Sequence, residues 1–470
     1  MCKKISIELR DWNVAHISGD YAVSTIDDAT SFRVNGFQFS YKYKKGWWDG
    51  KTHLYSKNDQ TFPAGLVGVV QRALRTWADK RGHTLEITVV DNRNIKDPIN
   101  NGLSLYGVTL RDYQLAGAKA MVAKQRGILK IATNGGKTIT FIAVAKHLGL
   151  QTLMLVPGKE LLHQVYAEFK RFLPPSEVGI IGDGKWKPKK YTVAIPNTLA
   201  SRIKKKKPEA IEYLKGVDVI CSDECHKVGA SQFYNVLKAC PAHYRYGLSG
   251  TPLDRTDGAD LKLIAQTGEV VYEVSNKQLI DAGLSTDVEI LFVTISGPDD
   301  ISHIREWSDV YELGIVKNDE RNREIAKYAS QMCSEGRGTL IIVNLIDHGE
   351  LLNELIPKSQ FMHGGLASAE RQKMLKSFKS GNIDVLIATN ILDEGVSIDN
   401  IDAIIMGAGG KSRIRTLQRL GRGLRTGGNS DTLRIVDFID SAHSMIAKHS
   451  MKRFQDYQAE DCFRMTLVDA

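Results

Sequence analysis

Residues Gly127-Ile-Leu-Lys-Ile-Ala-Thr-Asn-Gly-Gly-Lys-Thr138 join a short apolar run to a glycine turn that ends in Lys-Thr. A helical pattern of apolar residues follows over 137–148. Strand, glycine turn and helix in this order are what a phosphate-binding loop requires, because the start of the helix carries unpaired N–H groups and a partial positive charge. Ile131 stands where the strict G-x-x-x-x-G-K-[ST] pattern has its first glycine, so a plain turn ahead of a helix is the alternative.

In a phosphate loop the residue types of this turn have separate tasks. Gly135 and Gly136 would let the backbone approach the phosphates closely. Lys137 would reach the β- and γ-phosphates, and Thr138 would hold Mg²⁺ through its hydroxyl. The turn therefore predicts a nucleotide site for ATP with Mg²⁺.

A pair of carboxylates follows a second apolar run. Val217-Asp-Val-Ile-Cys-Ser222 leads directly into Asp223-Glu-Cys-His226. At the carboxyl end of a parallel strand this pair would lie beside the phosphate loop, where a metal ion and water meet. Asp223 suits the metal and Glu224 suits the base that orients the attacking water, because one carboxylate cannot do both. The alternative is a solvated acidic pair at a strand end.

Two arginines near residue 420 form a third candidate group. Gln418-Arg-Leu-Gly-Arg-Gly-Leu-Arg425 spaces Arg422 and Arg425 three residues apart, on one face if the segment is helical. An arginine brought to a transferring phosphoryl group stabilises its charge. The alternative is a solvated face, although Gly421 and Gly423 disfavour a helix kept for stability alone.

The hydrophobic pattern alternates short β-rich runs with longer helical segments, which predicts parallel sheets covered by helices. Helices are expected at 137–148 and 159–172. The first series of expected strands is 127–132, 152–156, 191–195, 217–222 and 244–249, and the second is 288–295, 339–343, 360–363, 385–389, 403–406 and 432–437. Two α/β units in tandem are the economical interpretation. No Pro/Ser-rich linker marks their join between 268 and 285.

Residues 1–103 are expected to form a small α+β unit with a helix over 65–82, closed by the turn-rich stretch 91–102. Residues 41–51 interleave four aromatic with four lysine side chains, a nucleic-acid pattern in which Lys44, Lys45 and Trp47 are candidate contacts. A β-hairpin with its rings in a core is the equally weighted alternative. The basic run 202–207 would contact a backbone or keep a loop solvated, and we favour solvation. The expected domains are 1–103, 104–284 and 285–470.

Composition supports this organisation and excludes other classes. A chain of 470 residues with 42% hydrophobic residues suits about three packed domains and excludes collagenous or wholly disordered proteins. The net charge of +9 suits an anionic partner. The N-terminus has no apolar signal region, and no window approaches 18 apolar residues, so we expect a cytoplasmic protein without a membrane contact. Six scattered cysteines predict reduced thiols, with zinc at Cys221, Cys225, His226 and Cys240 as a minor alternative.

These segments together resemble the superfamily 2 helicases, in the order of that family's motifs and over most of 110–425. Leu110–Gln114 is similar to the adenine-reading Gln segment, and Ala132–Thr138 is similar to motif I, with Asn134 in place of the usual first glycine. Further matches are Leu155–Leu161 to motif Ia, Asp223–His226 to motif II, Leu248–Pro252 to motif III, Leu340–Asn344 to motif IV, Ile387–Val396 to motif V and Gln418–Arg425 to motif VI. The aromatic and basic spacing over 37–68 resembles the recombination helicases of T-even bacteriophages.

The resemblance implies two tandem RecA-like domains of the P-loop NTPase fold, an ATP-dependent DNA helicase that remodels branched DNA, and a location in the host cytoplasm if a phage encodes the chain. It also implies recombination or single-strand-binding proteins as partners. The residues it assigns are Arg111, Gln114, Thr133, Asn134, Gly135, Gly136, Lys137, Thr138 and Gln418 for nucleotide; Lys137, Asp223, Glu224, Arg422 and Arg425 for catalysis; Pro157, Gly158, Lys159, Thr198, Asn344 and Thr389 for the nucleic-acid strand; and Ser249 and Thr251 for coupling.

Three other functions compete with this interpretation. The motor motifs contact a backbone, so a helicase acting on RNA or on an RNA–DNA hybrid stays open. An ATP-gated DNA clamp without turnover would be expected to lack the base or the arginines, yet Glu224, Arg422 and Arg425 are all present. A small-molecule P-loop kinase explains neither the second α/β unit nor motif VI.

Overall fold

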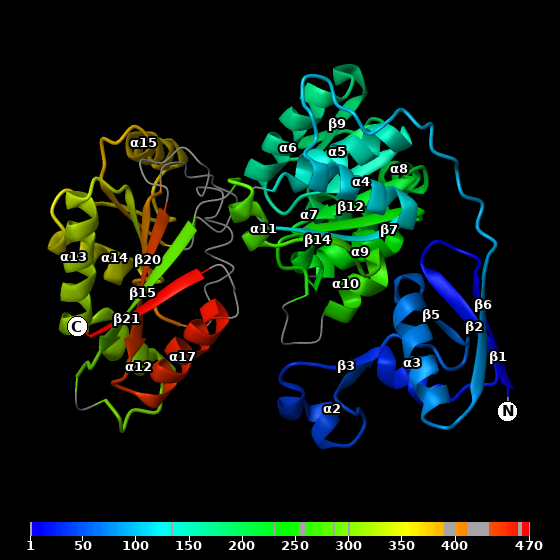
Figure 1. Ribbon diagram of the computed structural model, residues 1–470, viewed down its shortest axis with the longest axis horizontal. Coiled ribbons are helices and arrows are strands. Elements are labelled where there is room, and N and C mark those ends of the chain that lie inside the picture. The colour runs from blue at the N-terminus through cyan, green and yellow to red at the C-terminus, as the bar shows by residue number, and fades with distance from the viewer. Residues whose placement is uncertain are drawn as a thin grey trace. The chain divides into compact units, whose positions relative to one another are not determined.

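We analyse the protein in a computed structural model, which describes residues 2–132, 135–229, 231–253, 260–284, 287–298, 301–389, 401–410, 432–458 and 463–469 (Figure 1). The chain divides into two compact units. The first comprises Met1–Ile131 and Gly136–Val274, and the second contains Ser275–Ala470. Each unit is described by itself below.

The N-terminal domain, blue in Figure 1, is a four-stranded sheet with helices packed against it. The strand order is β5-β2-β1-β6, in which β1 pairs antiparallel with β2 and parallel with β6. Its core contains the alternate β1 residues Ile5, Ile7 and Leu9, as the sequence pattern indicates. Its elements are β1 (Cys2–Leu9), β2 (Val14–Gly19), α1 (Val23–Ala29), β3 (Ser31–Arg33), α2 (Tyr41–Lys44), β4 (Lys51–His53), β5 (Thr61–Pro63), α3 (Val67–Asp79) and β6 (Thr84–Asp91).

An eight-stranded sheet of order β10-β9-β11-β8-β12-β13-β7-β14 forms the rest of the first unit. Every neighbouring pair is parallel except β10 with β9. The strands are β7 (Arg126–Ile131), β8 (Thr152–Leu155), β9 (Val178–Gly182), β10 (Lys185–Lys187), β11 (Tyr191–Ala194), β12 (Val219–Asp223), β13 (Tyr244–Ser249) and β14 (Val270–Val274). The helices are α4 (Asp112–Lys124), α5 (Lys137–Leu148), α6 (Lys159–Phe172), α7 (Pro196–Lys204), α8 (Pro208–Lys215), α9 (Ser231–Ala239) and α10 (Asp260–Thr267).

The second unit contains a parallel seven-stranded sheet of order β17-β18-β16-β19-β20-β15-β21. Its strands are β15 (Asp287–Ile295), β16 (Thr339–Ile342), β17 (Gln360–Met362), β18 (Val385–Ala388), β19 (Ala403–Ile405), β20 (Thr432–Asp440) and β21 (Phe463–Asp469). Its helices include α11 (Asn276–Asp281), α12 (Trp307–Tyr311), α13 (Asp319–Ser334), α14 (Ile346–Leu355), α15 (Ser368–Lys379) and α17 (Ser444–Gln458). Both units are therefore α/β layers with helices on parallel sheets, and the tandem RecA-like fold is confirmed.

The structure confirms the strands expected from the sequence, with no end shifted by more than three residues, and both long helices 137–148 and 159–172. The strands β9, β10, β14 and β21 were not anticipated. β10 has only three residues, and β21 lies at a sheet edge where most of its side chains are exposed, so neither has a strong apolar pattern. The helix expected at 65–82 is shorter, because a 3₁₀ turn over Ala64–Leu66 precedes α3.

The N-terminal domain shares its core with helix α10, which belongs to the motor domain of the first unit. Ala265 of α10 belongs to the cluster of β1 and α3, with Leu261 and Ile264 packed against it. A methyl group on Gly65 would collide with the backbone carbonyls of Ile264 and Ala265, so only glycine allows this approach. Removal of residues 1–103 would thus expose apolar surface on α10, and point substitutions are the cleaner test of this domain's role.

His243 lies at the same junction and is buried. Its Nε2 is 2.9 Å from Oε1 of Gln125, and its ring makes an edge contact with Trp12 of the N-terminal domain. Burial, followed by the nearby charges of Arg93 and Arg126, lowers the pKa of His243 to about 4 from its usual 6.5. The folded protein therefore holds this imidazole neutral at pH values where the unfolded chain protonates it.

We predict that His243→Gln makes the folding stability of the first unit less sensitive to acid. Above pH 6.5 the imidazole is neutral in both states; as the pH falls from 6.5 to about 4, only the unfolded chain gains the proton, so stability decreases. The loss approaches the order of 3 kcal/mol. Thermal melts across this range should decline less steeply for the variant, whereas His303→Gln, at an exposed histidine, should follow the wild type. Parallel curves for wild type and H243Q would refute the assignment.

Candidate nucleotide and nucleic-acid sites

Parallel pairing of β7, β13 and β12 brings the chemistry-bearing segments of the first unit to one edge of the sheet. Asp223, at the end of β12, pairs in register with Leu248 of β13. Ser249, at the end of β13, pairs with Lys130 of β7, immediately before the glycine turn. The phosphate loop, the carboxylate pair and the Ser249–Thr251 segment therefore emerge side by side at the carboxyl ends of these strands.

The glycine turn leads directly into α5, whose first residue is Lys137. Gly136 adopts φ 79°, a left-handed conformation that favours glycine. The ammonium of Lys137 donates to the backbone carbonyl of Ile131 at 3.2 Å. This bond closes the turn across its base and holds the cation over the start of α5. Thr133 and Asn134 lie outside the described residues.

Gln114 packs against this turn. It is 4% exposed, and its Oε1 accepts a hydrogen bond from the backbone N–H of Arg111 at 3.0 Å. A Cβ on Gly136 would collide with Nε2 of Gln114, so the glycine is required both by its φ and by the amide lying over it. The Gln114 side chain therefore joins α4 to the phosphate loop, a contact that sequence alone did not indicate.

Asp223 and Glu224 differ in burial and conformation. Asp223 is 4% exposed, and its Oδ1 accepts from the N–H of Glu224 at 2.9 Å. Glu224 has φ 47°, a left-handed conformation that residues other than glycine seldom adopt. Its side chain is half-buried, so the two carboxylates differ in their access to solvent.

His226 connects the carboxylates to the end of β13. Its Nδ1 lies 3.3 Å from Oε2 of Glu224 and 3.1 Å from Oγ of Ser249. Oγ of Ser249 also accepts from the backbone N–H of Thr251 at 3.2 Å. In the sequence, His226 stands out only as the last residue of the Asp-Glu-Cys-His motif and as a ligand of the minor zinc alternative, without a role in the nucleotide site. The histidine beside the acidic pair was the available signal.

Cys225 lies beneath this network and is fully buried. Burial, followed by the charges of Glu224 and Asp223, raises the pKa of its thiol well above the usual value. The protonated thiol packs against Gly247 as a small apolar group, which argues against the zinc alternative. Among the described residues, no three His, Cys, Asp or Glu side chains gather as a metal site.

The residues expected to contact the nucleic-acid strand in the first unit also share this sheet edge. Pro157, Gly158 and Lys159 follow β8, and Thr198 follows its parallel neighbour β11. Nζ of Lys159 lies 2.9 Å from Oδ1 of Asp183, which also contacts His163 at 3.1 Å. Lys159 first, and then His163, lowers the pKa of Asp183. The sequence pattern does not indicate this acidic partner, because Asp183 follows β9, a strand that the pattern does not predict.

In the second unit the corresponding residues follow β16 and β18. The amide nitrogen of Asn344 donates to the hydroxyl of Tyr311 at 3.0 Å and to the carbonyl of Ala408 at 3.4 Å. Thr389 is nearly buried, and its N–H donates to the carbonyl of Met362 at 3.2 Å. Asn344 thus helps fix the segment after β19.

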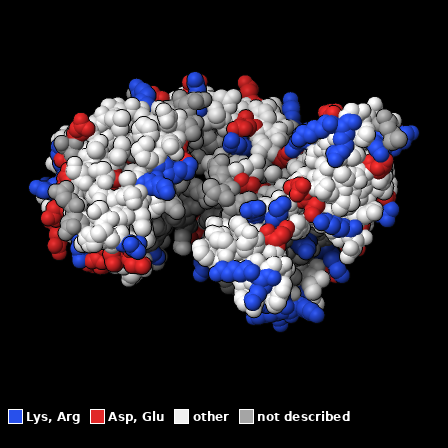
Figure 2. All heavy atoms as spheres, turned by 90° about the horizontal axis from the view of Figure 1, so that it is seen from below, with Lys and Arg blue, Asp and Glu red and all other residues white. Residues whose placement is uncertain are grey.

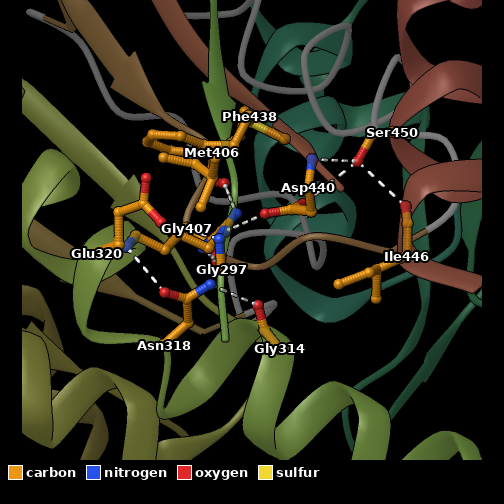
Figure 3. A network of polar contacts seen from close by, with 12 residues as sticks. Gly297, Gly314, Asn318, Glu320, Met406, Gly407, Phe438, Asp440, Ile446 and Ser450 are labelled. Atoms are coloured by element: carbon orange, nitrogen blue, oxygen red, sulfur yellow. Dashed lines mark hydrogen bonds and ion pairs between the residues drawn. The ribbon is translucent and has the colours of Figure 1, made fainter. Parts of the chain in front are cut away.

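A buried ionic network also holds residues 406–407, which directly follow β19 (Figure 3). Arg321 of α13 donates to Oδ1 of Asp440 at 2.8 Å, to the carbonyl of Gly407 at 2.6 Å and to that of Met406 at 3.1 Å. Asp440 in turn accepts from Ser450 of α17. These charge-assisted bonds join α13, β20 and α17 to the end of β19. Gln418, Arg422, Arg425 and most of motif V lie beyond, outside the described residues.

The ring and lysine side chains of residues 39–47 in the N-terminal domain are exposed, and the alternative of a hairpin with its rings in a core is wrong. β3 and β4 pair at the base of this segment, but 3₁₀ and α-helical turns fill the loop between them. Trp47 is 72% exposed and makes an edge contact with Tyr41, whose ring also lies under the ammonium of Lys45. Trp48 is half-buried, and its indole N–H donates to the carbonyl of Lys51 at 2.6 Å.

Three family models match the chain in sequence. They are "DNA helicase UvsW, N-terminal" over residues 4–82, "Type III restriction enzyme, res subunit" over 107–254 and "Helicase conserved C-terminal domain" over 321–427. The ATP-dependent DNA helicase uvsW of Enterobacteria phage T4 is 23% identical, across 97% of this chain and 98% of that protein. The DNA 3'-5' translocase XPB2 of Sulfurisphaera tokodaii is 25% identical, across 74% of this chain and 86% of that protein.

Solved structures agree on the fold. Dbp5 of S. cerevisiae, bound to RNA and ADP BeF3, matches with a TM-score of 0.51 at 17% identity, across 77% of this chain and 94% of that one. Among the described helices, none has the length and apolarity needed to cross a membrane.

The helicase family models that match residues 107–254 and 321–427, each on a RecA-like sheet, indicate an ATP-dependent helicase similar to those of superfamily 2. Within that class the chain resembles the UvsW helicase of phage T4, and the resemblance includes the N-terminal domain.

We predict that Glu224→Gln separates nucleotide binding from hydrolysis. The amide cannot take a proton from water, so turnover should fall by at least about 100-fold while ATP still binds. Lys137→Ala should instead lose both, because the phosphates lose their cation. Binding of a fluorescent ATP analogue and steady-state hydrolysis measure the two properties, with Glu212→Gln on the exposed face of α8 as the matched control. Near-wild-type hydrolysis by E224Q would remove Glu224 from the role of base.

Proposed function

We propose that this helicase hydrolyses ATP to translocate on DNA and to unwind and remodel branched DNA, such as forks and recombination intermediates. The observation that carries the proposal is the group of exposed aromatic rings and lysines at residues 39–47. The domain that carries them shares its core with helix α10 of the motor domain. Similarity to a DNA helicase along nearly the whole chain, N-terminal domain included, supports the same substrate.

The nucleotide site is proposed to work through this chain's own groups in the first unit. The loop around the phosphates would consist of Thr133, Asn134, Gly135 and Gly136. The adenine base would be contacted by Arg111 and Gln114. Lys137 would neutralise the phosphates. Mg²⁺, when bound, would neutralise developing phosphate charge, and Thr138 and Asp223 are the side chains that would hold it. Two observations support a nucleotide with Mg²⁺ at this place. The carboxylate of Asp223 is buried, and a Cβ atom on Gly136 would fill the space at the glycine turn.

Glu224 is proposed to orient the attacking water, with His226 holding its carboxylate. Ser249 and Thr251 are proposed to couple ATP hydrolysis to nucleic-acid contact. His226 contacts Glu224 on one side and Ser249 on the other, so a movement of the Glu224 carboxylate would be passed to Ser249 and Thr251. From the second domain, Gln418, Arg422 and Arg425 are assigned to the nucleotide by their motif. The backbone of the nucleic-acid strand would be contacted by Pro157, Gly158, Lys159, Thr198, Asn344 and Thr389.

The N-terminal segment is proposed as a second contact for nucleic acid. Trp47 and Tyr41 offer exposed ring surface for base stacking, and Lys44 and Lys45 offer cations for phosphates. On the face drawn in Figure 2, lysine and arginine side chains form several separate groups, with acidic side chains between them. Charge alone therefore does not mark a single track there, and the exposed rings are the more specific sign.

We expect a four-way DNA junction or a forked duplex to stimulate ATP hydrolysis more strongly than linear duplex, single-stranded DNA or RNA at equal nucleotide concentration. The physical reason is that a branch offers duplex and single-strand backbone at once to separate contact surfaces. Steady-state hydrolysis with each polymer, and separation of labelled strands from the junction, measure the two outputs. Equal or greater stimulation by RNA would favour an RNA helicase, and tight binding without turnover would favour a clamp.

The adjacent tryptophans provide a matched pair of variants. Trp47→Ala should weaken DNA binding by roughly tenfold, the loss of one stacked base, and leave the melting temperature unchanged. Trp48→Ala should lower the melting temperature, because its ring is half-buried and its N–H bond to Lys51 is lost. Fluorescence anisotropy and thermal melts on both variants decide. Early melting of W47A with unchanged affinity would make the segment structural.

A further inference from the structure

Two basic segments that are separate in the sequence lie together at one edge of the first unit's motor sheet. Residues 173–216 carry ten Lys and Arg against four Asp and Glu, a net charge of +6 within a chain whose total is +9. The first segment is β10, the edge strand, with Lys185 and Lys187. The second is the turn between α7 and α8, with Lys204 to Lys207. We name these six lysines the lysine surface.

A stacked pair of side chains fixes the two segments against each other. The guanidinium of Arg202 lies 4.3 Å from the ring centre of Trp186 on β10, and Arg202 also bonds Glu209 at 2.7 Å. Trp186 packs edge-on against Tyr213 of α8. The ends of α7 and α8 are thereby held beside β10, so the lysines on either side form one patch.

The charges of this patch are not neutralised locally. All six lysines are exposed, and none makes an ion pair with any residue that the structure describes. Lysines on an edge strand commonly prevent strand pairing, which would explain Lys185 and Lys187 alone. It does not explain four consecutive lysines from the last residue of α7 to the residue before α8, where like charges repel each other.

The chemistry of the patch indicates its partner. Lysine ammonium groups are point charges that bind phosphates without the planar geometry that arginine offers to bases or carboxylates. Within residues 185–207, all of which are described, no aromatic ring is fully exposed, so the patch lacks the stacking surface that a single strand needs. Lys204, the first lysine of the turn, lies about 9 Å along α7 from Thr198. Thr198 is one of the residues expected to contact the nucleic-acid strand.

We propose that the lysine surface binds the sugar-phosphate backbone of duplex DNA, as a contact separate from the strand track and from the exposed rings of residues 39–47. The inference rests on the proposed DNA function and adds the duplex arm of a branched substrate to it. Each lysine that meets a phosphate releases a counterion, so the contact should strengthen binding most at low salt.

The test compares full-length protein with the variant Lys204→Gln, Lys205→Gln, Lys206→Gln, Lys207→Gln. Affinities for a blunt duplex and for a single strand are measured by anisotropy from about 50 to about 200 mM salt. At the lowest salt the duplex dissociation constant should rise at least about tenfold, and the slope of log affinity against log salt should fall by roughly two to four, since each contact contributes about 0.9. Single-strand affinity and ATP hydrolysis without DNA should stay within about twofold of the wild type.

Two controls make the result specific. The matching Lys→Arg variant keeps the charge and should bind duplex like the wild type. Lys373→Gln with Lys376→Gln, on the exposed face of α15, removes charge elsewhere and should leave the duplex slope unchanged. An unchanged duplex affinity and slope in the four-lysine variant would overturn the inference, as would an equal loss for single strands. Failure of the wild type to bind any DNA would instead overturn the proposed function.

Discussion

The hydrogen-bonded register of β12, β13 and β7 is the constraint on which the rest of the first unit depends. Because the three strands are parallel neighbours, Asp223, Ser249 and the turn before Lys137 must emerge at one edge. Contacts between elements then complete the site: His226 lies between Glu224 and Ser249, and the amide of Gln114 packs over Gly136. A slip of one residue in any of these strands would turn its side chains to the opposite face and separate the groups.

Buried arginines hold the loops of both units by bonding backbone carbonyls. Arg245 donates to carbonyls of Leu237, Cys240 and Gln266, and so joins the ends of α9 and α10 to β13. In the second unit Arg453 is held by Asp437 and reaches the carbonyl of Gly410 at 2.6 Å. Burial opposes its charge, but Asp437 and Asp440 outweigh burial and raise the pKa of Arg453. Removal of one partner from such a buried pair costs about 3–5 kcal/mol, so these loops are strongly fixed.

The contact surfaces proposed for nucleic acid differ in chemistry, and the difference follows from their neighbours. Residues 39–47 lie on a short paired base, so their rings stay outside the core and are available for stacking. On β10 the equivalent ring, Trp186, is covered by Arg202, and only ammonium groups are left exposed. Lys159 is a third case, because Asp183 competes for its charge. A motor that engages rings, strand backbone and duplex backbone at separate places is suited to a branched substrate.

The sequence by itself determined the two α/β units, most of their strands to within three residues, and the candidate residues of the phosphate loop and acidic pair, but not β9, β10, β14 and β21. Those features are local, because a strand and the turn after it are encoded by adjacent residues. Only the tertiary structure decided which groups meet across elements: Gln114 over Gly136, Asp183 against Lys159, and the two lysine segments joined through Trp186 and Arg202. It also decided that the rings of Tyr41, Tyr43 and Trp47 are solvent-exposed, whereas the sequence pattern fitted a buried hairpin equally well. Such contacts depend on packing between residues far apart in the chain, which no local pattern contains.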